Sequence, residues 1–222
     1  MVAEVTAHRS ESAASSWTAA LLAALGLCGC GTNKPELPPD LSAPASCVAP
    51  AYPAGPYGNE PGALLKNACF RGFSAPERSA LLEDALEPLA LSDFYDPDGE
   101  GPVRVLLLNT AALWCAACQI EHRTLPERYR ELSPRGLALM TAVFQDERYE
   151  PAEFSDLTAW VDTFQTNFPI VLDPGYSFGL YASAETAPLN LVVDPKTMTI
   201  LEKFVGDQPA VMWPYIEALL AR

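Results

Sequence analysis

Apolar residues gather into short runs along this chain, and stretches with helical spacing lie between the runs. Three of the runs have the length of buried strands. Helical spacing separates them, and a strand–helix–strand order of this kind predicts parallel strands with right-handed connections. In chain order the predicted elements are a helix at 75–90, a strand at 103–108, a helix ending near 132, strands at 137–144 and 168–172 around a helix begun by Ser155 or Asp156, a helical turn at 176–182, a strand after Pro188, a strand at 198–205 and a helix at 210–220.

The helix predicted for 75–90 is based on a capping signal and on leucine spacing. Ser74 and Glu77 form a capping-box pattern, with Pro76 in the first turn. The leucines that follow recur on one helical face, at 81, 82, 86 and 89. An acidic segment then spans 93–101. Its alternating acids lack the full calcium-loop pattern, so a surface turn is the preferred interpretation.

Two cysteines lie where the first predicted strand becomes a helix. The sequence there reads Trp114-Cys115-Ala116-Ala117-Cys118. Free N–H groups at a helix N-terminus stabilise a thiolate, so Cys115 is the expected nucleophile. Cys118 lies one turn later and is close enough to close a disulfide, which makes it the expected resolving thiol. The segment therefore predicts thiol-disulfide exchange through a redox-active dithiol.

At these residues the chain resembles the thioredoxin superfamily, and within it the TlpA/ResA-like oxidoreductases of the bacterial envelope. The resemblance rests on Asn109, Trp114, the two cysteines and Glu121, together with a second motif at 187–194 that begins Ala-Pro. In that family a cis-proline precedes such a strand and lies against the disulfide, which implies this role for Pro188. The resemblance covers about 60–222. It implies an α/β, thioredoxin-like three-layer sandwich with a mixed central sheet and an N-terminal extension.

The family resemblance also suggests roles for the residues around the dithiol. Trp114 is expected either to cover the site or to be a packed core residue. Asn109 occupies the position where cytoplasmic thioredoxins place a buried acid, and an amide cannot take a proton from Cys118. That task would fall to water or to Glu121, although a plain surface position on the helix is the simpler interpretation of Glu121.

Two departures from the family pattern concern the helix after the dithiol. Relatives place a kinking proline five residues after the second cysteine, where this chain has Arg123. Pro126 follows three residues later, so a kink is expected to be displaced. His122 shares a helical face with the cysteines, but a metal site would need more ligands. A solvent-facing histidine is the default expectation, and neither a metal nor another cofactor is predicted.

The start of the chain resembles a lipoprotein signal. A polar segment is followed by an apolar run at 17–27 that is too short to span a membrane. The run ends in a lipobox-like sequence in which Cys30 would be lipidated after cleavage, and Cys28 fits the pattern less well. The simpler alternatives are an uncleaved anchor or a wrongly assigned start. The predicted segments are a signal peptide at 1–29, a tether at 30–61 and the thioredoxin-like domain at 62–222.

The tether is rich in proline, alanine and glycine and lacks any strand or helix period. Cys47 falls within it, and Cys69 follows just beyond its end. In an oxidising envelope these two cysteines would form a structural disulfide. Two unrelated thiols, or a second redox pair, remain alternatives because sequence separation does not decide among them.

The net charge of the chain limits the kinds of partner that it is expected to bind. The net charge of −14 argues against nucleic acid, and it is better explained as a solvated acidic surface than as an acidic docking site. The leading function is that of an envelope oxidoreductase, with a reductase among its possible roles, held to the membrane by its N-terminal lipid and acting on thiol- or disulfide-bearing proteins outside the cytoplasm.

Two other classes are less well matched. A peroxiredoxin-like peroxidase would carry proline and threonine before the nucleophile, where this chain has Leu108 and Ala112. A non-enzymatic thioredoxin-fold lipoprotein that binds a metal or a partner would need a wider cysteine spacing and a distant histidine. Only His122 is left after removal of the leader.

Overall fold

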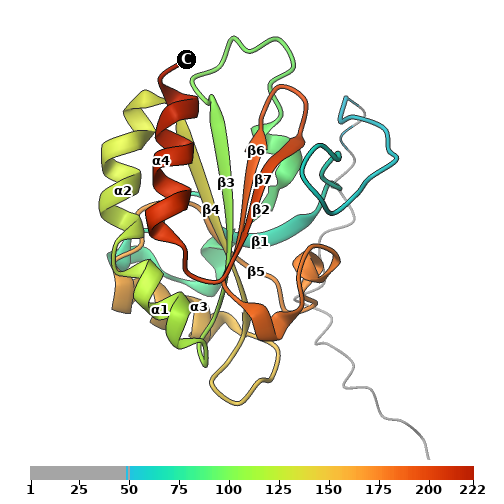
Figure 1. The fold of residues 1–222 in the computed structure, drawn as a ribbon. Helices are drawn as coiled ribbons and strands as arrows, with labels where there is room; N and C mark the ends of the chain where they lie inside the picture. The colour runs from blue at the N-terminus through green and yellow to red at the C-terminus, as the bar shows by residue number, and fades with distance from the viewer. Residues whose placement is uncertain (1–48, 50) are drawn as a thin grey trace, which may run out of the picture. The chain divides into compact units, whose positions relative to one another are not determined.

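The computed structural model describes residue 49 and residues 51–222, and a seven-stranded mixed sheet forms the centre of this part (Figure 1). The strand order is β2-β1-β5-β4-β3-β6-β7. Neighbours β3, β4 and β5 are parallel, and every other pair is antiparallel. The strands are β1 (Cys69–Phe73), β2 (Glu87–Ala90), β3 (Val105–Ala112), β4 (Leu137–Gln145), β5 (Ile170–Leu172), β6 (Leu189–Asp194) and β7 (Thr199–Val205).

All four α-helices pack against one face of the sheet (Figure 1). The helices are α1 (Ala116–His122), α2 (Leu125–Leu132), α3 (Phe154–Phe164) and α4 (Pro209–Leu220). Side chains alternate across a strand, so every second residue of the central strands points toward these helices. Leu107 and Leu139 do so, and they share a buried cluster with Trp213 of α4. A second buried cluster on this face includes Cys115 and Cys118.

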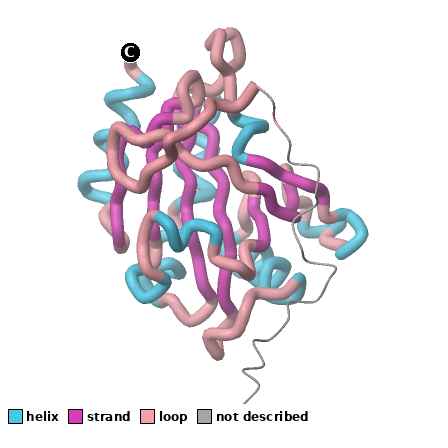
Figure 2. The backbone as a smooth tube through the Cα atoms, turned by 90° about the vertical axis from the view of Figure 1, so that its right-hand side faces the viewer, coloured by secondary structure: helices cyan, strands magenta, loops and turns pink. Residues whose placement is uncertain are grey.

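The opposite face is covered by the N-terminal segment and by short 3-10 turns, η4 (Leu91–Phe94) and η6 (Ser177–Leu180). Figure 2 looks onto this face, where loops and short helical turns lie in front of the strands. Fully buried Leu65 donates its N–H to Met198 O at 2.9 Å. Lys203 Nζ donates to Asn59 O at 3.0 Å. The layers are thus helices, sheet, and a third layer of turns and loops, which confirms the predicted thioredoxin-like sandwich.

The helix predicted for 75–90 is wrong. The structure has two short 3-10 turns there, η2 (Arg78–Ala80) and η3 (Glu83–Ala85), followed by strand β2. Leu86 and Leu89 are buried, but Leu82 is 61% exposed, so the leucines do not share one face. Pro88 would interrupt a helix, whereas an edge strand tolerates the missing N–H group.

The helix that carries the dithiol is interrupted at Arg123 and Thr124, between α1 and α2. Pro126 lies in the first turn of α2. A proline ring cannot pack against the carbonyl group four residues earlier in a continuous helix, here that of His122. The chain therefore leaves the first helix at His122 and enters α2 at Leu125.

At two of the turns that follow helices, one residue has a left-handed backbone conformation. Gly136, with φ of 105°, lies between the 3-10 turn η5 (Ser133–Arg135) and β4. Gln165, with φ of 53°, ends α3. The prediction that Ser155 or Asp156 begins α3 is wrong, because the N-cap residue is Glu153. Asp156 lies in the first turn, where its Oδ2 accepts the N–H of Glu153 at 2.8 Å.

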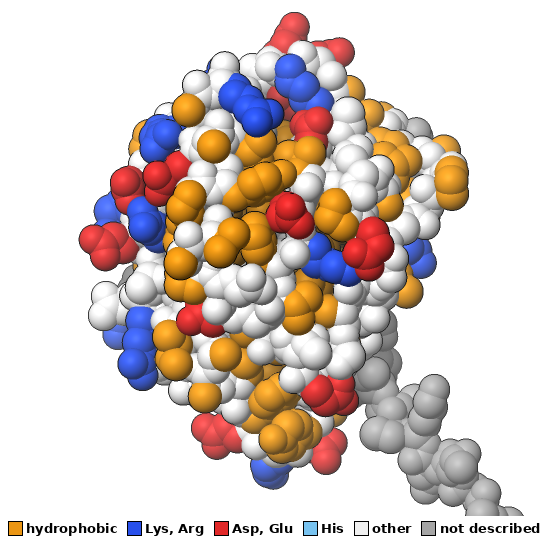
Figure 3. Space-filling model, in the orientation of Figure 1, with side chains coloured by type: hydrophobic (Ala, Val, Ile, Leu, Met, Phe, Trp, Pro, Cys, Tyr) orange, Lys and Arg blue, Asp and Glu red, His pale blue; other side chains and the backbone are white. Residues whose placement is uncertain are grey.

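The acidic segment at 93–101 forms a turn ordered by one carboxylate. Asp96 accepts the N–H of Gly99 at 3.1 Å and that of Gly101 at 2.9 Å. On the face shown in Figure 3, acidic and basic side chains are interspersed among apolar ones. Among the described helices, none combines the length and apolarity needed to cross a bilayer.

Candidate active site

The two active-site cysteines lie at the start of α1, directly after β3. Cys115 is the N-cap residue of this helix, and Cys118 is in its first turn. Their sulfurs are joined in a disulfide, with 5.2 Å between the Cα atoms. Cys115 is 3% exposed and Cys118 is fully buried. The predicted pair is therefore formed, and Cys115 is the more accessible of the two sulfurs.

The surroundings of Cys115 come from two separate parts of the chain. The backbone N–H of Cys118 donates to Cys115 Sγ at 3.0 Å. On the other side, Ala187 O lies 3.5 Å from the same sulfur. The Ala187–Pro188 peptide bond is cis, and Pro188 is buried. The structure thus brings the proline motif to the dithiol, as the family resemblance implied.

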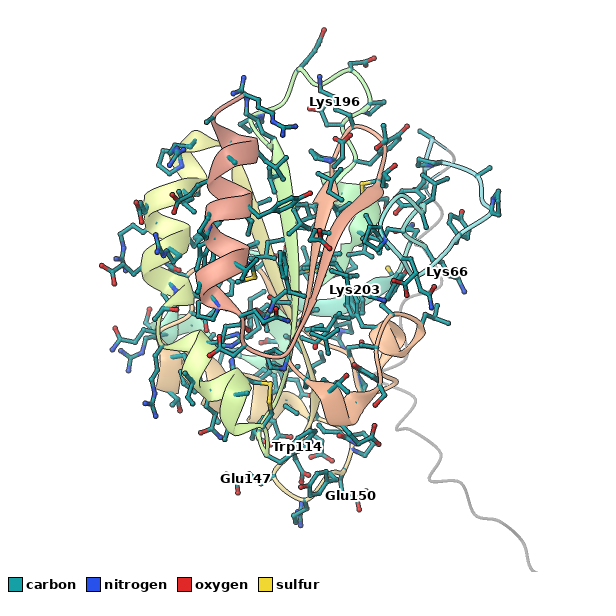
Figure 4. The ribbon with its side chains drawn as sticks, viewed as in Figure 1. Lys66, Trp114, Glu147, Glu150, Lys196 and Lys203 are labelled. Carbon is teal, nitrogen blue, oxygen red and sulfur yellow. A yellow bond between two sulfur atoms is a disulfide. The ribbon has the colours of Figure 1, made fainter. Side chains whose placement is uncertain are left out.

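Trp114 lies beside the disulfide at one end of the sheet. Its indole Nε1 donates to Gln145 Oε1 at 3.0 Å, and its ring stacks on Tyr149 with centroids 5.0 Å apart. Figure 4 shows Trp114 below the disulfide, near Glu147 and Glu150. The side chain is half-buried. It is fixed by specific contacts and still reaches the surface next to the dithiol.

Glu121 is not the surface residue that its helical position suggested. Its side chain is 3% exposed and points into the protein. Asn109 Nδ2 donates to Glu121 Oε2 at 2.7 Å, and Asn190 Nδ2 donates to Glu121 Oε1 at 2.7 Å. The two amides also bond each other, from Asn109 Nδ2 to Asn190 Oδ1 at 2.9 Å. Each carboxylate oxygen is thus held by one amide.

The amides form a polar row across three neighbouring strands. Asn109 is in register with Thr141 of β4 on one side and with Asn190 of β6 on the other. Thr141 Oγ1 donates to Asn109 Oδ1 at 3.0 Å. All three side chains are buried, and they lie on the sheet face that α1 covers. The row fixes Glu121 one helical turn beyond Cys118.

Burial dominates the acidity of Glu121. Desolvation raises its pKa from 4.5 to about 7, while the bonds from Asn190 and Asn109 oppose this rise and Asp207 adds to it. A carboxyl group with a pKa near 7 exists in both protonation states at neutral pH. A group of this kind is suited to accept and release a proton.

His122 is fully buried, so the expectation of a solvent-facing histidine is wrong. Its Nδ1 lies 3.0 Å from Cys118 O and its Nε2 lies 3.2 Å from Thr141 Oγ1. Its ring contacts Trp160 of α3 with centroids 4.9 Å apart. Burial lowers the pKa of His122 to about 3, so the ring is neutral. It ties α1 to β4 and α3.

Other predicted residues lie elsewhere or outside the described part. Cys69 begins β1, but Cys47 and Cys30 lie outside the described residues, so the disulfide and the lipidation stay predictions. Within residues 51–222, no group of three metal-ligating side chains comes together.

Sequence reasoning gave no role to Asn190, Thr141 or Asp207. A polar residue in the middle of a buried apolar strand was the available signal for the first two.

Comparison with known proteins agrees with this geometry. No family model matches the chain. The thiol:disulfide interchange protein DsbE of Vibrio cholerae is 30% identical over 146 residues, which cover 63% of this chain and 71% of that protein. Among solved structures, a DsbF homologue from Corynebacterium diphtheriae has a TM-score of 0.52 at 18% identity and covers 70% of this chain and 86% of its own.

The thioredoxin domain of a thiol-disulfide oxidoreductase from Bacteroides vulgatus has a TM-score of 0.51 at 15% identity, over 72% of this chain and 97% of that one. These two structures support the fold, and the V. cholerae relative supports the family. With a Cys-x-x-Cys disulfide between Cys115 and Cys118, the chain belongs to the DsbE-like thiol:disulfide interchange proteins, thiol-disulfide oxidoreductases of the thioredoxin family.

Proposed function

We propose that this protein is a lipid-anchored oxidoreductase of the bacterial cell envelope that exchanges its Cys115–Cys118 disulfide with proteins outside the cytoplasm. The observation that carries the proposal is the position of that disulfide at the start of α1, beside the carbonyl of Ala187 and the cis-proline Pro188. The name of the V. cholerae relative, a thiol:disulfide interchange protein, supports the same chemistry.

In the reducing direction, the Cys115 thiolate attacks one sulfur of a partner disulfide. A mixed disulfide forms and the other partner sulfur leaves as a thiolate. Cys118 then loses its proton and attacks Cys115 Sγ, which restores the protein disulfide and releases the second partner thiolate. Water protonates the two partner thiolates, so two electrons pass from the protein dithiol to the partner.

Geometry supports this division of roles. The N–H of Cys118 donates to Cys115 Sγ at 3.0 Å, and such a bond favours the thiolate of a reduced Cys115. Cys118 is fully buried and cannot meet a partner directly. Glu121 lies one turn after Cys118 on the same side of α1, where its carboxylate is the base that accepts the Cys118 proton. Pro188 lacks an N–H group, which leaves the adjacent Ala187 carbonyl to face the incoming chain.

Electrostatics favours a reductase over an oxidant. A strong oxidant of this family is strong because its reduced, thiolate form is stabilised. Here a buried carboxylate at Glu121 follows the dithiol, and its negative charge disfavours a second negative charge on either thiol. The disulfide is therefore the favoured form, and electrons flow from this protein to its partners.

The reduction potential tests this direction. The full-length protein is equilibrated in glutathione buffers of graded ratio, and the oxidised fraction is counted by alkylation and mass spectrometry. A midpoint near thioredoxin's roughly −270 mV supports a reductase, whereas a midpoint near DsbA's roughly −120 mV would reverse the assignment. A Glu121→Gln variant should shift toward the oxidant side, because its reduced form is no longer opposed by a carboxylate.

The envelope location is proposed from the start of the chain. The apolar run and the small residues before Cys30 fit a lipoprotein signal, and the acidic composition fits a solvated domain outside the cytoplasm. Metabolic labelling with a fatty-acid analogue tests it. Wild-type protein and the Cys28→Ala control should carry label in the membrane fraction, and Cys30→Ala should carry none. Label on Cys30→Ala would contradict Cys30 as the lipidated residue, and the absence of label on wild type would contradict the anchor.

A further inference from the structure

The loop that follows β4 closes a ring of contacts around Trp114. The indole Nε1 of Trp114 donates to Gln145 Oε1 at 3.0 Å, and the amide Nε2 of the same glutamine donates to Tyr149 O at 2.9 Å. The Tyr149 ring in turn stacks on the Trp114 ring, with centroids 5.0 Å apart and an angle of 27° between the planes. The three residues therefore hold one another in place beside Cys115, which directly follows Trp114 in the chain.

A carboxylate within this loop fixes its shape. Asp146 Oδ1 accepts the N–H of Arg148 at 2.7 Å and that of Glu150 at 2.9 Å. Between these two residues, Tyr149 has a left-handed backbone with φ of 67°, a conformation that is unfavourable for a residue with a Cβ atom. The loop therefore keeps the Tyr149 ring in a position that its own backbone preference would not select.

The two stacked rings, which we call the aromatic platform, reach the surface next to the dithiol. Tyr149 is 63% exposed and Trp114 is half-buried. On its inner side, Trp114 contacts the buried ring of Phe144 edge-on, with centroids 6.4 Å apart. An exposed aromatic ring that is already ordered loses little conformational freedom when another molecule binds to it. The platform is thus a prepared contact surface beside Cys115.

Acidic side chains border the platform. Glu147 and Glu150 are both exposed and lie near Trp114 (Figure 4). Arg148, the one base among residues 146–150, is paired with Asp146 at 3.0 Å. Within the described part of the chain, neither glutamate forms an ion pair. Three acids and one base give this loop a net negative charge next to an exposed aromatic face.

We propose that the aromatic platform, with Glu147 and Glu150, recognises a lysine or arginine side chain close to the reacting cysteine of a partner protein. A cation is attracted to the face of an aromatic ring, and nearby carboxylates add to this attraction. An extended chain of three residues spans up to about 10 Å, so the cation would lie within about three residues of the partner cysteine. This inference rests on the proposed exchange of Cys115 with partner disulfides, and it adds a preference among those partners.

The other groups near Cys115 do not distinguish the charge of a partner side chain. The carbonyl of Ala187, 3.5 Å from Cys115 Sγ, accepts a backbone N–H, which every residue except proline possesses. Ile120 of α1 is 54% exposed, but it carries no polar group. Glu121 and His122 are buried, so a partner cannot reach them. Among the described residues around the dithiol, the platform and its glutamates are therefore the feature that favours a cation.

Exchange with charged and neutral peptides tests the proposal. Reduced full-length protein is mixed with symmetric disulfide dimers of a short peptide that has lysine, glutamine or glutamate on both sides of its single cysteine. Samples are quenched in acid, and the Cys115–Cys118 disulfide is counted by mass spectrometry. Each rate constant is divided by that for reduction of the same peptide by dithiothreitol, which corrects for the effect of peptide charge on the reactivity of its cysteine. Wild type should favour the lysine peptide over the glutamate peptide by roughly fivefold, and less in high salt.

Variants of the loop separate the ring from the charges. Tyr149→Gly removes the ring at a backbone conformation that glycine adopts readily, so the loop keeps its shape. It should lower the preference for the lysine peptide by about two- to fivefold, whereas Tyr149→Phe should keep most of it. A protein with both Glu147→Gln and Glu150→Gln should lose the salt dependence of the preference. Glu127→Gln, an exposed acid on α2, is the matched control and should retain the wild-type preference.

Three outcomes would overturn the inference while leaving thiol exchange intact. The first is equal corrected rate constants for the three peptides in wild type. The second is a Tyr149→Gly protein that keeps the wild-type preference. The third is a Tyr149→Gly protein that is slowed equally toward all three peptides, because the ring would then act only by holding Trp114. Absence of reaction between wild type and any of the peptides would instead refute the proposed function itself.

Discussion

Replacement of Glu121 by glutamine should change how stability depends on pH. Burial raises the Glu121 pKa from 4.5 to about 7, so between these values the folded protein holds a proton that the unfolded chain has released. Folding stability therefore falls as pH rises through this window. A difference of 2.5 units corresponds to about 3–4 kcal/mol, at about 1.4 kcal/mol per unit. Glutamine does not titrate, so the variant should lack this loss.

The variant also loses one hydrogen bond. Both Asn109 and Asn190 present N–H groups to the Glu121 carboxyl, whose two oxygens can both accept a hydrogen bond even when it is protonated, whereas a glutamine side chain offers only one oxygen. That mismatch costs about 1–2 kcal/mol. Glu121→Gln should therefore be less stable than wild type near pH 4.5 by about 1–2 kcal/mol, and more stable by a similar amount near pH 8.

Urea unfolding of the oxidised protein, followed by tryptophan fluorescence from pH 4.5 to 8, measures this crossing. The difference between the two proteins removes the shared contributions of other titrating groups, such as buried His122 and Asp173. Glu127→Gln on the exposed side of α2 is the control and should give no pH-dependent difference. Parallel stability curves for wild type and Glu121→Gln would refute a raised pKa for the buried Glu121 carboxyl.

Two backbone predictions follow from the fold. Gln165 is exposed and ends α3 at a φ of 53°, so Gln165→Gly should stabilise the protein by about 1 kcal/mol in urea unfolding, whereas Gln165→Ala should not. Gly72 is buried where β1 meets β5, and an added Cβ would lie 2.6 Å from Val171 Cα. Gly72→Ala should therefore lower the unfolding free energy by about 1–3 kcal/mol. An unchanged urea midpoint would show that the two strands can separate without cost.

The central strands could be predicted from the sequence because they are buried on both faces. Almost every residue in them is therefore apolar, and such a run is easy to recognise. β4 (Leu137–Gln145) is nearly the predicted 137–144. The prediction failed at 75–90, where leucine spacing fits a helix. In the structure Leu89 is buried within the extended edge strand β2, and Leu86 is buried just before that strand. Local spacing does not reveal that Cys69–Phe73 offers β2 a pairing partner.

The dithiol was predictable because all its determinants are local. Its neighbours were not, because they depend on strand register. Asn109 and Asn190 are 81 residues apart in sequence, and they meet only because β3 and β6 pair at that position. The same holds for Thr141, whose partnership with His122 crosses from β4 to α1. Helix position alone suggested a surface for Glu121 and His122, and the polar row beneath α1 explains why both are buried.

The central claim is that Cys115 attacks and Cys118 resolves, and a trapping experiment tests it most directly. Reduced wild type, Cys118→Ser and Cys115→Ser are mixed with a peptide that contains one disulfide, and the products are separated under non-reducing conditions. The account predicts that Cys118→Ser accumulates a stable mixed disulfide mapped to Cys115 and that wild type completes the exchange. Cys115→Ser should form almost no mixed disulfide at the active site, because its remaining active-site thiol, Cys118, is fully buried. Trapping through Cys118, or complete turnover by Cys118→Ser, would contradict it.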